Sequence, residues 1–234
     1  MNISGLQKTT VVDYPGEIAC TIFLRGCNFR CGFCHNPNLV VKACGDNFSE
    51  EEVLIFLKKR VGKLDAVCIT GGEPLMTLDI NFVKRIREMG YKIKIDTNGS
   101  FPEKLKEVID LGLVDYIAMD IKGAREDYSS IVGVDVDLEK IEKSIKIIHD
   151  FGSYEFRTTV VGRFHNSDSL VSMGKWLNSV CDSKPNRFYL QGFTKENAGM
   201  IDEDFNNEPN VSEGFLEELK EKVSEFFEEV GIRR

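Results

Sequence analysis

The sequence lacks the features that direct a chain into a membrane or out of the cell. It contains no apolar stretch long enough to span a bilayer, and residues 1–10 have neither the apolar core nor the cleavage-type ending of a secretion signal. The seven cysteines are an odd number, which argues against a framework of disulfides. We therefore expect a cytoplasmic protein whose thiols are reduced.

Positively charged residues are fewer than negatively charged ones. The 234 residues include 30 Lys and Arg against 38 Asp and Glu, which gives a net charge of -8. A surface with this balance disfavours a general attraction to phosphate groups. The composition thus predicts neither a nucleic-acid partner nor a membrane partner.

Short apolar or β-branched segments alternate with helical patterns along most of the chain. The predicted strands are residues 18–24, 66–70, 91–96, 116–121, 154–161 and 187–190. The predicted helices are one that begins with the capping pattern at Ser49 and those at 80–89, 102–111, 138–149, 167–180 and 212–230. Successive βα units predict a parallel sheet with right-handed crossovers.

The number of these units defines the expected fold class. Six βα units fall short of the eight that close a full barrel, so we expect an incomplete (β/α)6 barrel. The hydrophobic content of 42% is sufficient for one substantial core. We expect a single domain with a barrel core at 17–192, an acidic loop at 193–211 and a C-terminal helix at 212–230.

Three cysteines follow the first predicted strand with the spacing C-x3-C-x2-C. Cys27, Cys31 and Cys34 can supply three thiolates to a soft metal centre and leave one position open for a small molecule. A closed zinc site that recruits His35 or Cys44 is the other interpretation. The spacing lacks a distant second ligand pair, which favours a cluster, but a zinc-binding or electron-transfer module without enzymatic activity stays open at this point.

Polar residues and glycines mark the ends of the other predicted strands. They are Gly71, Gly72 and Glu73 after the second strand, Asp96 and Thr97 after the third, Asp120 and Lys122 at the fourth, Arg157 within the fifth, and Gln191 at the sixth. Sites in parallel α/β folds assemble beyond the carboxyl ends of the strands. Each residue alone is explained by a turn, a cap or an ion pair, but their shared position predicts one site.

These motifs resemble the radical S-adenosylmethionine (SAM) enzymes. The resemblance rests on the three-cysteine loop, on Phe33 before its last cysteine and on the Gly-Gly-Glu-Pro sequence at 71–74. The segments 10–16 and 34–37 are most similar to activating enzymes of glycyl-radical proteins, in particular those of anaerobic ribonucleoside-triphosphate reductase. The match covers about residues 5–192, and the cysteine-rich ferredoxin-like insert of related activases is absent.

The resemblance implies a set of cofactor contacts. A [4Fe-4S] cluster would be held by Cys27, Cys31 and Cys34, with SAM on the fourth iron. The implied SAM contacts are Phe33 to the adenine, Gly71 and Gly72 to the methionine moiety, Glu73 to the ammonium, Lys122 and Arg157 to the carboxylate, and Gln191 to the ribose in place of a family histidine. Asp96, Thr97 and Asp120 match a monovalent-cation site in the formate-lyase branch.

The resemblance also implies an activity. The cluster delivers one electron to SAM, and the reductive cleavage leads to abstraction of a hydrogen atom from a glycine Cα of a partner enzyme. The partner would be anaerobic ribonucleotide reductase, with flavodoxin or ferredoxin as the electron donor. A small-molecule substrate, as in the deazaguanine-forming radical SAM enzymes, remains the alternative within the same class.

Overall fold

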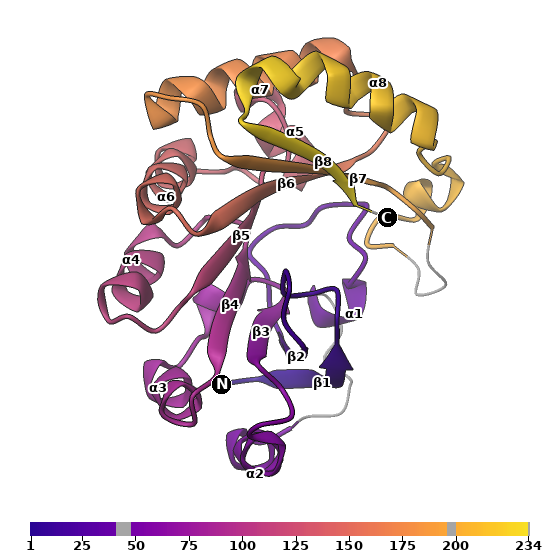
Figure 1. Cartoon of the computed structure of the whole chain (residues 1–234). Helices are drawn as coiled ribbons and strands as arrows, with labels where there is room; N and C mark the ends of the chain where they lie inside the picture. The colour runs from indigo at the N-terminus through magenta and orange to yellow at the C-terminus, as the bar shows by residue number, and fades with distance from the viewer. Residues whose placement is uncertain (41–47, 196–199, 234) are drawn as a thin grey trace. The chain divides into compact units, whose positions relative to one another are not determined.

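The computed structural model describes residues 1–40, 48–195 and 200–233 (Figure 1). Cys44, expected to be a loop thiol, lies outside the described residues. The strands follow one another in the sheet in the order of the chain. The chain divides into two compact units, which are Met1–Asn28, Asn38–Thr97 and Glu103–Ile117 in the first and Phe29–Pro37, Asn98–Pro102 and Ala118–Arg234 in the second.

The first unit contains the amino-terminal strands. They are β1 (Ile3–Thr10), β2 (Ala19–Leu24), β3 (Ala66–Gly71) and β4 (Lys92–Thr97). β1 is antiparallel to β2, whereas β2, β3 and β4 are parallel. The accompanying helices are α1 (Pro37–Val40), α2 (Glu50–Arg60), α3 (Ile80–Glu88) and α4 (Pro102–Asp110), with a short 3-10 turn η1 (Pro74–Met76). The parallel order places the carboxyl ends of β2, β3 and β4 at the same edge.

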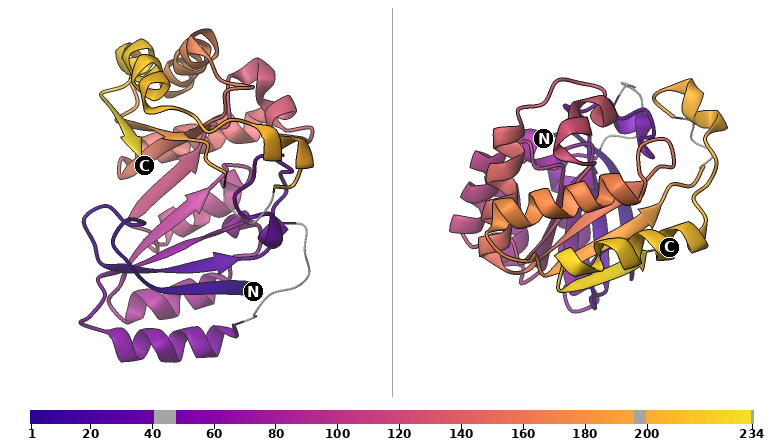
Figure 2. Two further views of the ribbon diagram at one scale, coloured as in Figure 1. Left: turned by 90° about the vertical axis from the view of Figure 1, so that its right-hand side faces the viewer. Right: turned by 90° about the horizontal axis from the view of Figure 1, so that it is seen from above.

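The second unit contains the carboxyl-terminal strands. β5 (Tyr116–Asp120) begins in the first unit and ends in the second, and β6 (Tyr154–Val160), β7 (Arg187–Gly192) and β8 (Glu229–Arg233) follow. β6, β7 and β8 are parallel. The helical elements are η2 (Arg125–Asp127), α5 (Tyr128–Val132), α6 (Leu138–Phe151), α7 (Ser167–Cys181), η3 (Glu203–Asn207), α8 (Glu213–Val223) and η4 (Ser224–Phe226). α8 packs against α7, β7 and β8 (Figure 2).

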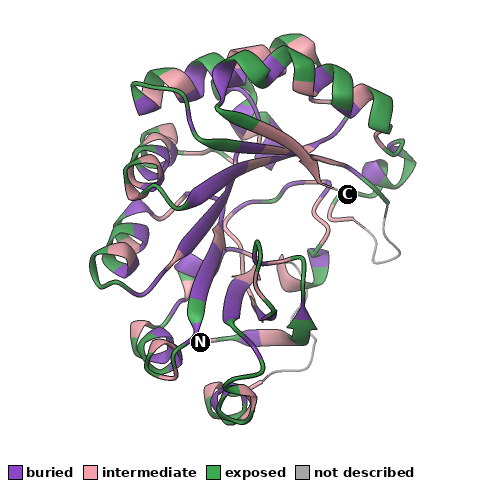
Figure 3. Cartoon of the chain, viewed as in Figure 1, coloured by how far each residue is buried: buried purple, intermediate pink, exposed green. Residues whose placement is uncertain are grey.

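The strands β2 to β6 are mostly buried, whereas β1 and β8 are mostly intermediate or exposed, and the helices keep one exposed side (Figure 3). The thiols of Cys20, Cys68 and Cys181 are buried, as the apolar patterns around them predict. The helix α2 begins with the predicted capping box, in which Ser49 and Glu52 satisfy each other's backbone N–H groups. No described helix is long and apolar enough to cross a membrane.

The predicted fold class is confirmed, because the six predicted strands correspond to β2 through β7 in an α/β arrangement. Two strands were not predicted, namely β1 and β8. The helix predicted at 212–230 is wrong in its last part, since α8 ends at Val223 and β8 follows. Val230 and Ile232 pair with Phe188 and Leu190 of β7, and this long-range pairing overrides the local helical pattern.

Candidate functional site

The Gly-Gly turn after β3 packs against the backbone that leads into the cysteine loop. The N–H groups of Gly72 and Glu73 donate to the carbonyls of Leu24 and Gly26 at 2.9 and 2.7 Å. Gly71 has φ +129°, and a Cβ there would lie 2.1 Å from the Leu24 oxygen. A Cβ on Gly72 would lie 1.9 Å from the Gly26 oxygen. Both positions therefore require glycine for the close approach of two chain segments.

Glu73 is a buried carboxylate with two donors on one oxygen. Its Oε1 accepts from the backbone N–H of Leu75 at 3.0 Å and from Thr97 Oγ1 at 2.8 Å. Glu73 is 0% exposed, so these hydrogen bonds offset part of the free energy lost when its carboxylate leaves water. Thr97 at the end of β4 thus orients Glu73, a relation that the sequence interpretation of Thr97 did not include.

Asp96 pairs with a buried lysine that we did not predict as part of the site. Lys94 and Asp96 lie on the same face of β4, and Lys94 Nζ is 2.5 Å from Asp96 Oδ1. The Lys94 side chain is 1% exposed and lies opposite Cys68 in the register of β3 and β4. A lysine inside an apolar strand was the signal in the sequence, since lysine is almost never fully buried unless it is paired.

In the second unit, Asp120 lies between two cations. Arg157 Nε donates to Asp120 Oδ1 at 2.9 Å, and Lys122 Nζ donates to Oδ2 at 3.2 Å. Burial by itself would raise the pKa of Asp120, but Arg157 and Lys122 outweigh it and hold the pKa well below the usual range. Burial likewise would lower the pKa of Lys122, and Asp120 raises it above its ordinary value. The structure therefore brings together these three predicted residues as a charged group.

His165 contacts the backbone of Lys122, a member of this charged group. The backbone N–H of Val161 donates to His165 Nδ1 at 2.9 Å, and His165 Nε2 donates to the Lys122 carbonyl at 3.0 Å. The ring thus accepts at Nδ1 and donates at Nε2, which is a neutral tautomer that holds the Lys122 carbonyl, and burial lowers the pKa of His165. This role of His165 was not predicted, because no local motif connects the two residues.

A second charged pair reaches the group from the end of the chain. Both oxygens of Glu155 accept from the Arg233 guanidinium of β8, and Glu155 is 0% exposed. Arg157 Nη1 lies 4.0 Å from Glu155 Oε1. Arg233 also stacks over Tyr189 at 4.3 Å from the ring centroid. The bidentate pair could not be predicted, because no pattern in the sequence indicated β8: the predicted helix ran to residue 230, and Arg233 was assigned to no element.

The cysteine loop crosses the boundary between the two units. Cys27 belongs to the first, and Cys31 and Cys34 belong to the second. Burial raises the pKa of Cys31 and that of Cys34 above the usual range of a thiol. No three cysteine, histidine, aspartate or glutamate side chains in the described part of the chain are gathered into a ready-made metal site. The three thiols fit an iron–sulfur cluster by their chemistry, and binding iron requires the loss of their protons.

Phe33 is buried within a group of aromatic rings. Its ring lies 6.0 Å from that of Phe164 and 5.9 Å from that of Phe205 in η3. A Cβ on Gly32 would lie 2.5 Å from the Phe205 ring. The turn η3, which lies in the segment 193–211 expected to be an acidic loop, therefore packs on the cysteine loop. Arg163 stacks on Phe205 at 4.3 Å and holds this turn in place.

Gln191 lies on the partly exposed end of β7. It pairs with Thr159 of β6 and with Arg233 of β8 in the strand register. Gln191 thus lies beside Arg233, the residue that pairs with Glu155. No described hydrogen bond joins Gln191 to Asp120 or Lys122.

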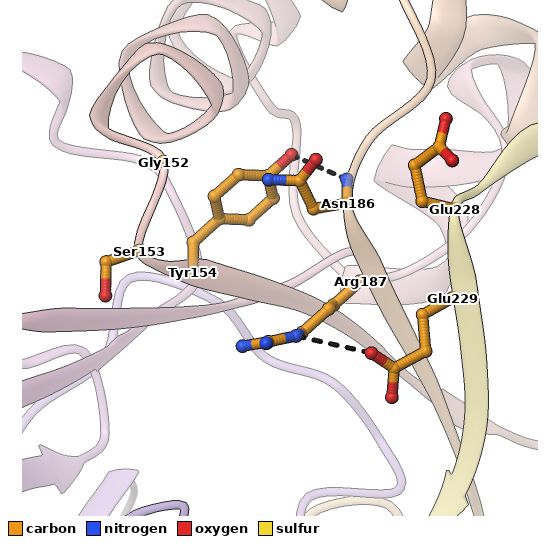
Figure 4. A pocket seen from close by; sticks show the side chains of 7 residues that line it. All are labelled: Gly152, Ser153, Tyr154, Asn186, Arg187, Glu228 and Glu229. Atoms are coloured by element: carbon orange, nitrogen blue, oxygen red, sulfur yellow. Dashed lines mark hydrogen bonds and ion pairs between the residues drawn. The ribbon is translucent and has the colours of Figure 1, made fainter.

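A cavity of about 590 Å³ lies at the opposite ends of the strands in the second unit (Figure 4). Its lining residues are Gly152, Ser153, Tyr154, Asn186, Arg187, Glu228 and Glu229. These residues precede or begin β6, β7 and β8, whereas the predicted residues lie toward the carboxyl ends. The cavity contains none of the predicted site residues and is not part of this site.

The three-thiol loop and the strand-end residues carry the resemblance to radical SAM enzymes, and a comparison with known families shows this class. The profile of the Radical SAM superfamily matches residues 21–177. The chain belongs to this superfamily and is an enzyme of this class. Membership implies a [4Fe-4S] cluster and SAM as cofactors, and it favours the cluster interpretation of the cysteines over a zinc module.

The chain is similar over almost its whole length to an archaeal protein. It is 32% identical over 238 residues, 99% of this chain and 95% of the other, to a Methanocaldococcus jannaschii protein provisionally named as a glycyl-radical enzyme activating enzyme. It is 33% identical over 138 residues to the pyruvate formate-lyase-activating enzyme of Clostridium pasteurianum. This alignment covers 56% of this chain and 57% of the relative.

A third relative bears on the small-molecule alternative. The chain is 27% identical over 186 residues to the 7-carboxy-7-deazaguanine synthase of Thermococcus kodakarensis, covering 68% of this chain and 69% of the relative. Among solved structures, a radical SAM methyltransferase from Sphaerobacter thermophilus has a TM-score of 0.69 at 13% identity, over 94% of this chain and 67% of that chain. The latter likeness concerns the fold alone.

Proposed function

We propose that this protein generates a glycyl radical on a partner enzyme, with anaerobic ribonucleotide reductase as the partner and flavodoxin or ferredoxin as the electron donor. The observation that carries the proposal is the similarity over 99% of the chain to a glycyl-radical enzyme activating enzyme. Pyruvate formate-lyase-activating enzymes support the same type of activity. The choice of ribonucleotide reductase rests on the segments 10–16 and 34–37.

Cys27, Cys31 and Cys34 would hold the cluster, which supplies one electron to SAM when both are bound. Glu73 is suited to the SAM ammonium, because its carboxylate is buried and already oriented by Thr97 and Leu75. A carboxylate accepts about four hydrogen bonds, so an ammonium can share it with these donors. The chain thereby contributes a fixed anion at the position where the substrate carries a cation.

The charged group in the second unit is suited to the SAM carboxylate. Arg157 and Lys122 supply two positive charges against one negative charge on Asp120. The Glu155 and Arg233 pair is neutral in sum, so the group carries one excess positive charge. His165 holds the backbone of Lys122, and Arg233 holds Glu155. This excess favours a carboxylate ligand over an uncharged one.

Two further predicted contacts belong to the nucleoside. Phe33 would present an aromatic surface to the adenine, and Gln191 would contact the ribose. Phe164 and Phe205 cover Phe33 with apolar rings, which would help to keep water away from an adenine beside them. Exclusion of water protects a reactive species until the glycine of the partner reaches it.

The test uses the reconstituted protein with dithionite, SAM and the anaerobic ribonucleotide reductase of the same organism. We expect slow formation of 5′-deoxyadenosine without the partner and a carbon-centred EPR doublet on the partner after mixing. The partner with its radical-site glycine replaced by alanine is the control and should give no doublet.

The deazaguanine-type alternative is tested in the same assay, because the Thermococcus relative supports it. A small pterin-like substrate is added in place of the protein partner. If this substrate accelerates turnover while no glycyl-radical protein of the organism acquires a signal, the activase proposal is wrong.

A further inference from the structure

Lys94 is a charged group in the interior of the first unit. Its side chain is 1% exposed, and its ammonium lies 2.5 Å from Asp96 Oδ1. Transfer of an ammonium from water into a protein interior is unfavourable unless a partner compensates for the lost hydration. Its neighbours in the strand, Ile93 and Ile95, are fully buried apolar residues. The pair is therefore a specific feature of this strand and not part of a solvated surface.

The Lys94–Asp96 pair includes a residue that was predicted to bind a monovalent cation. The family resemblance implies a monovalent cation at Asp96, Thr97 and Asp120. Within the first unit, Asp96 already has the Lys94 ammonium as its neighbour, and the Thr97 hydroxyl donates to Glu73. An added cation at Asp96 would meet the positive charge of Lys94.

The carboxylate of the second unit is in the same condition. Asp120 accepts from Lys122 and from Arg157, with one bond on each oxygen. Each carboxylate of the implied set thus has a side-chain cation within its own unit. These residues do not fit a monovalent-cation site.

We propose that the Lys94 ammonium takes the place of the monovalent cation at Asp96, so that this protein binds SAM without K⁺ or Na⁺. The inference rests on the proposed SAM site. An ammonium is a compact charge with three donors, close to K⁺ in size and charge. Because it is attached to β4, its position does not depend on the ionic composition of the solution. Lys94 acts as a positioning residue for the site through Asp96.

The first test is a salt series on the unmodified protein. The dissociation constant of SAM is measured by calorimetry on reconstituted protein in KCl, NaCl and choline chloride at equal ionic strength. We expect the three values to agree within about twofold. A constant that is about tenfold lower in KCl or NaCl than in choline chloride would overturn the proposal.

The second test removes the ammonium. Lys94→Met should weaken SAM binding by about tenfold in choline chloride, and KCl or NaCl should restore most of the loss. A purely structural role would not respond to a free cation. The matched control is Lys106→Met, which removes an exposed lysine paired with Asp110 and should leave the affinity unchanged in all three salts. Absence of rescue in a folded Lys94→Met protein would contradict the proposal.

A third measurement separates this inference from the proposed function. Line broadening of ²³Na is recorded on cluster-free protein, which needs neither SAM nor activity. We expect no specific broadening with the unmodified chain and a gain with Lys94→Met, whereas Lys94→Met combined with Asp96→Asn should not gain it. If Lys94→Met does not fold, the salt series and the ²³Na measurement on the unmodified chain decide. If SAM does not bind at all, the proposed function fails, and specific ²³Na binding by the unmodified chain still decides this inference.

Discussion

Thr97 donates a hydrogen bond of 2.8 Å to Glu73, which connects the end of β4 with the turn after β3. Both residues were predicted to contact cofactors, but in separate roles. The bond makes the orientation of the buried Glu73 carboxylate dependent on the neighbouring strand. It also means that the Thr97 hydroxyl serves a residue of the protein itself.

Thr97→Val should therefore weaken SAM binding while leaving the cluster intact. Loss of one hydrogen bond to a buried carboxylate corresponds to about 1.5 kcal/mol, or roughly tenfold in affinity. Calorimetry on reconstituted protein measures the change, and iron content provides the check on the cluster. Thr97→Ser retains the donor and should bind SAM nearly as well as the original chain. Equal affinity in the valine variant would show that the bond does not orient Glu73 for SAM.

Replacing Cys27, Cys31 or Cys34 by alanine, one at a time, should abolish the cluster. The unchanged chain should take up about four irons and four sulfides after anaerobic reconstitution, with broad absorption near the violet. Cys44→Ala is the control and should retain the full iron content. Stoichiometric zinc uptake without iron would contradict this prediction.

Gly72→Ala should destabilise the turn beside the cysteine loop. The added Cβ would lie 1.9 Å from the Gly26 oxygen, so backbone must move, at an expected loss of about 2 kcal/mol in the free energy of unfolding. Urea denaturation of cluster-free protein measures this loss. Gly214→Ala is the matched control, because a Cβ there meets nothing within 4 Å and alanine favours the helix α8. Equal stability of the two variants would exclude the close approach.

Arg233→Met should reduce stability more than the removal of an exposed arginine. It leaves Glu155 buried without its bidentate partner, which should lower the free energy of unfolding by about 2–4 kcal/mol. Arg187→Met removes an exposed partner of Glu229 and should lower it by less than about 1 kcal/mol. Urea denaturation of both variants gives the comparison. Similar losses would mean that β8 does not hold Glu155.

The stability of the cluster-free protein should fall as the pH drops below 6.5. Burial lowers the pKa of His165 from its ordinary value of 6.5, so below that pH the unfolded chain binds a proton that the folded chain does not. The stabilisation by the neutral ring is present above pH 6.5 and is lost as the pH falls toward the lowered pKa. Free energies of unfolding from pH 7.5 to about 5.5 should show a shallower slope in His165→Gln than in the original chain. Identical slopes would assign the pH dependence to other groups.

Features that depend on nearby residues could be predicted from the sequence alone. The three-thiol spacing, the Gly-Gly-Glu turn and the capping box at Ser49 each occupy a few successive positions, and their chemistry follows from those positions. The strands β2 through β7 were recognisable because short apolar runs alternate with longer amphipathic patterns. The close approach of Gly71 and Gly72 to the Leu24–Gly26 backbone adds a second reason why the Gly-Gly motif requires glycine.

The partners of these residues, in contrast, became known from the folded chain. Arg233 reaches Glu155 across 78 positions, and Thr97 reaches Glu73 across 24, so no local pattern connects them. The local pattern predicted a helix through residue 230, and pairing with β7 makes Glu229–Arg233 a strand instead. Phe205 likewise became buried only because Gly32 leaves room for its ring. The free energy of such contacts comes from burial and pairing between distant segments, which the order of residues within either segment does not contain.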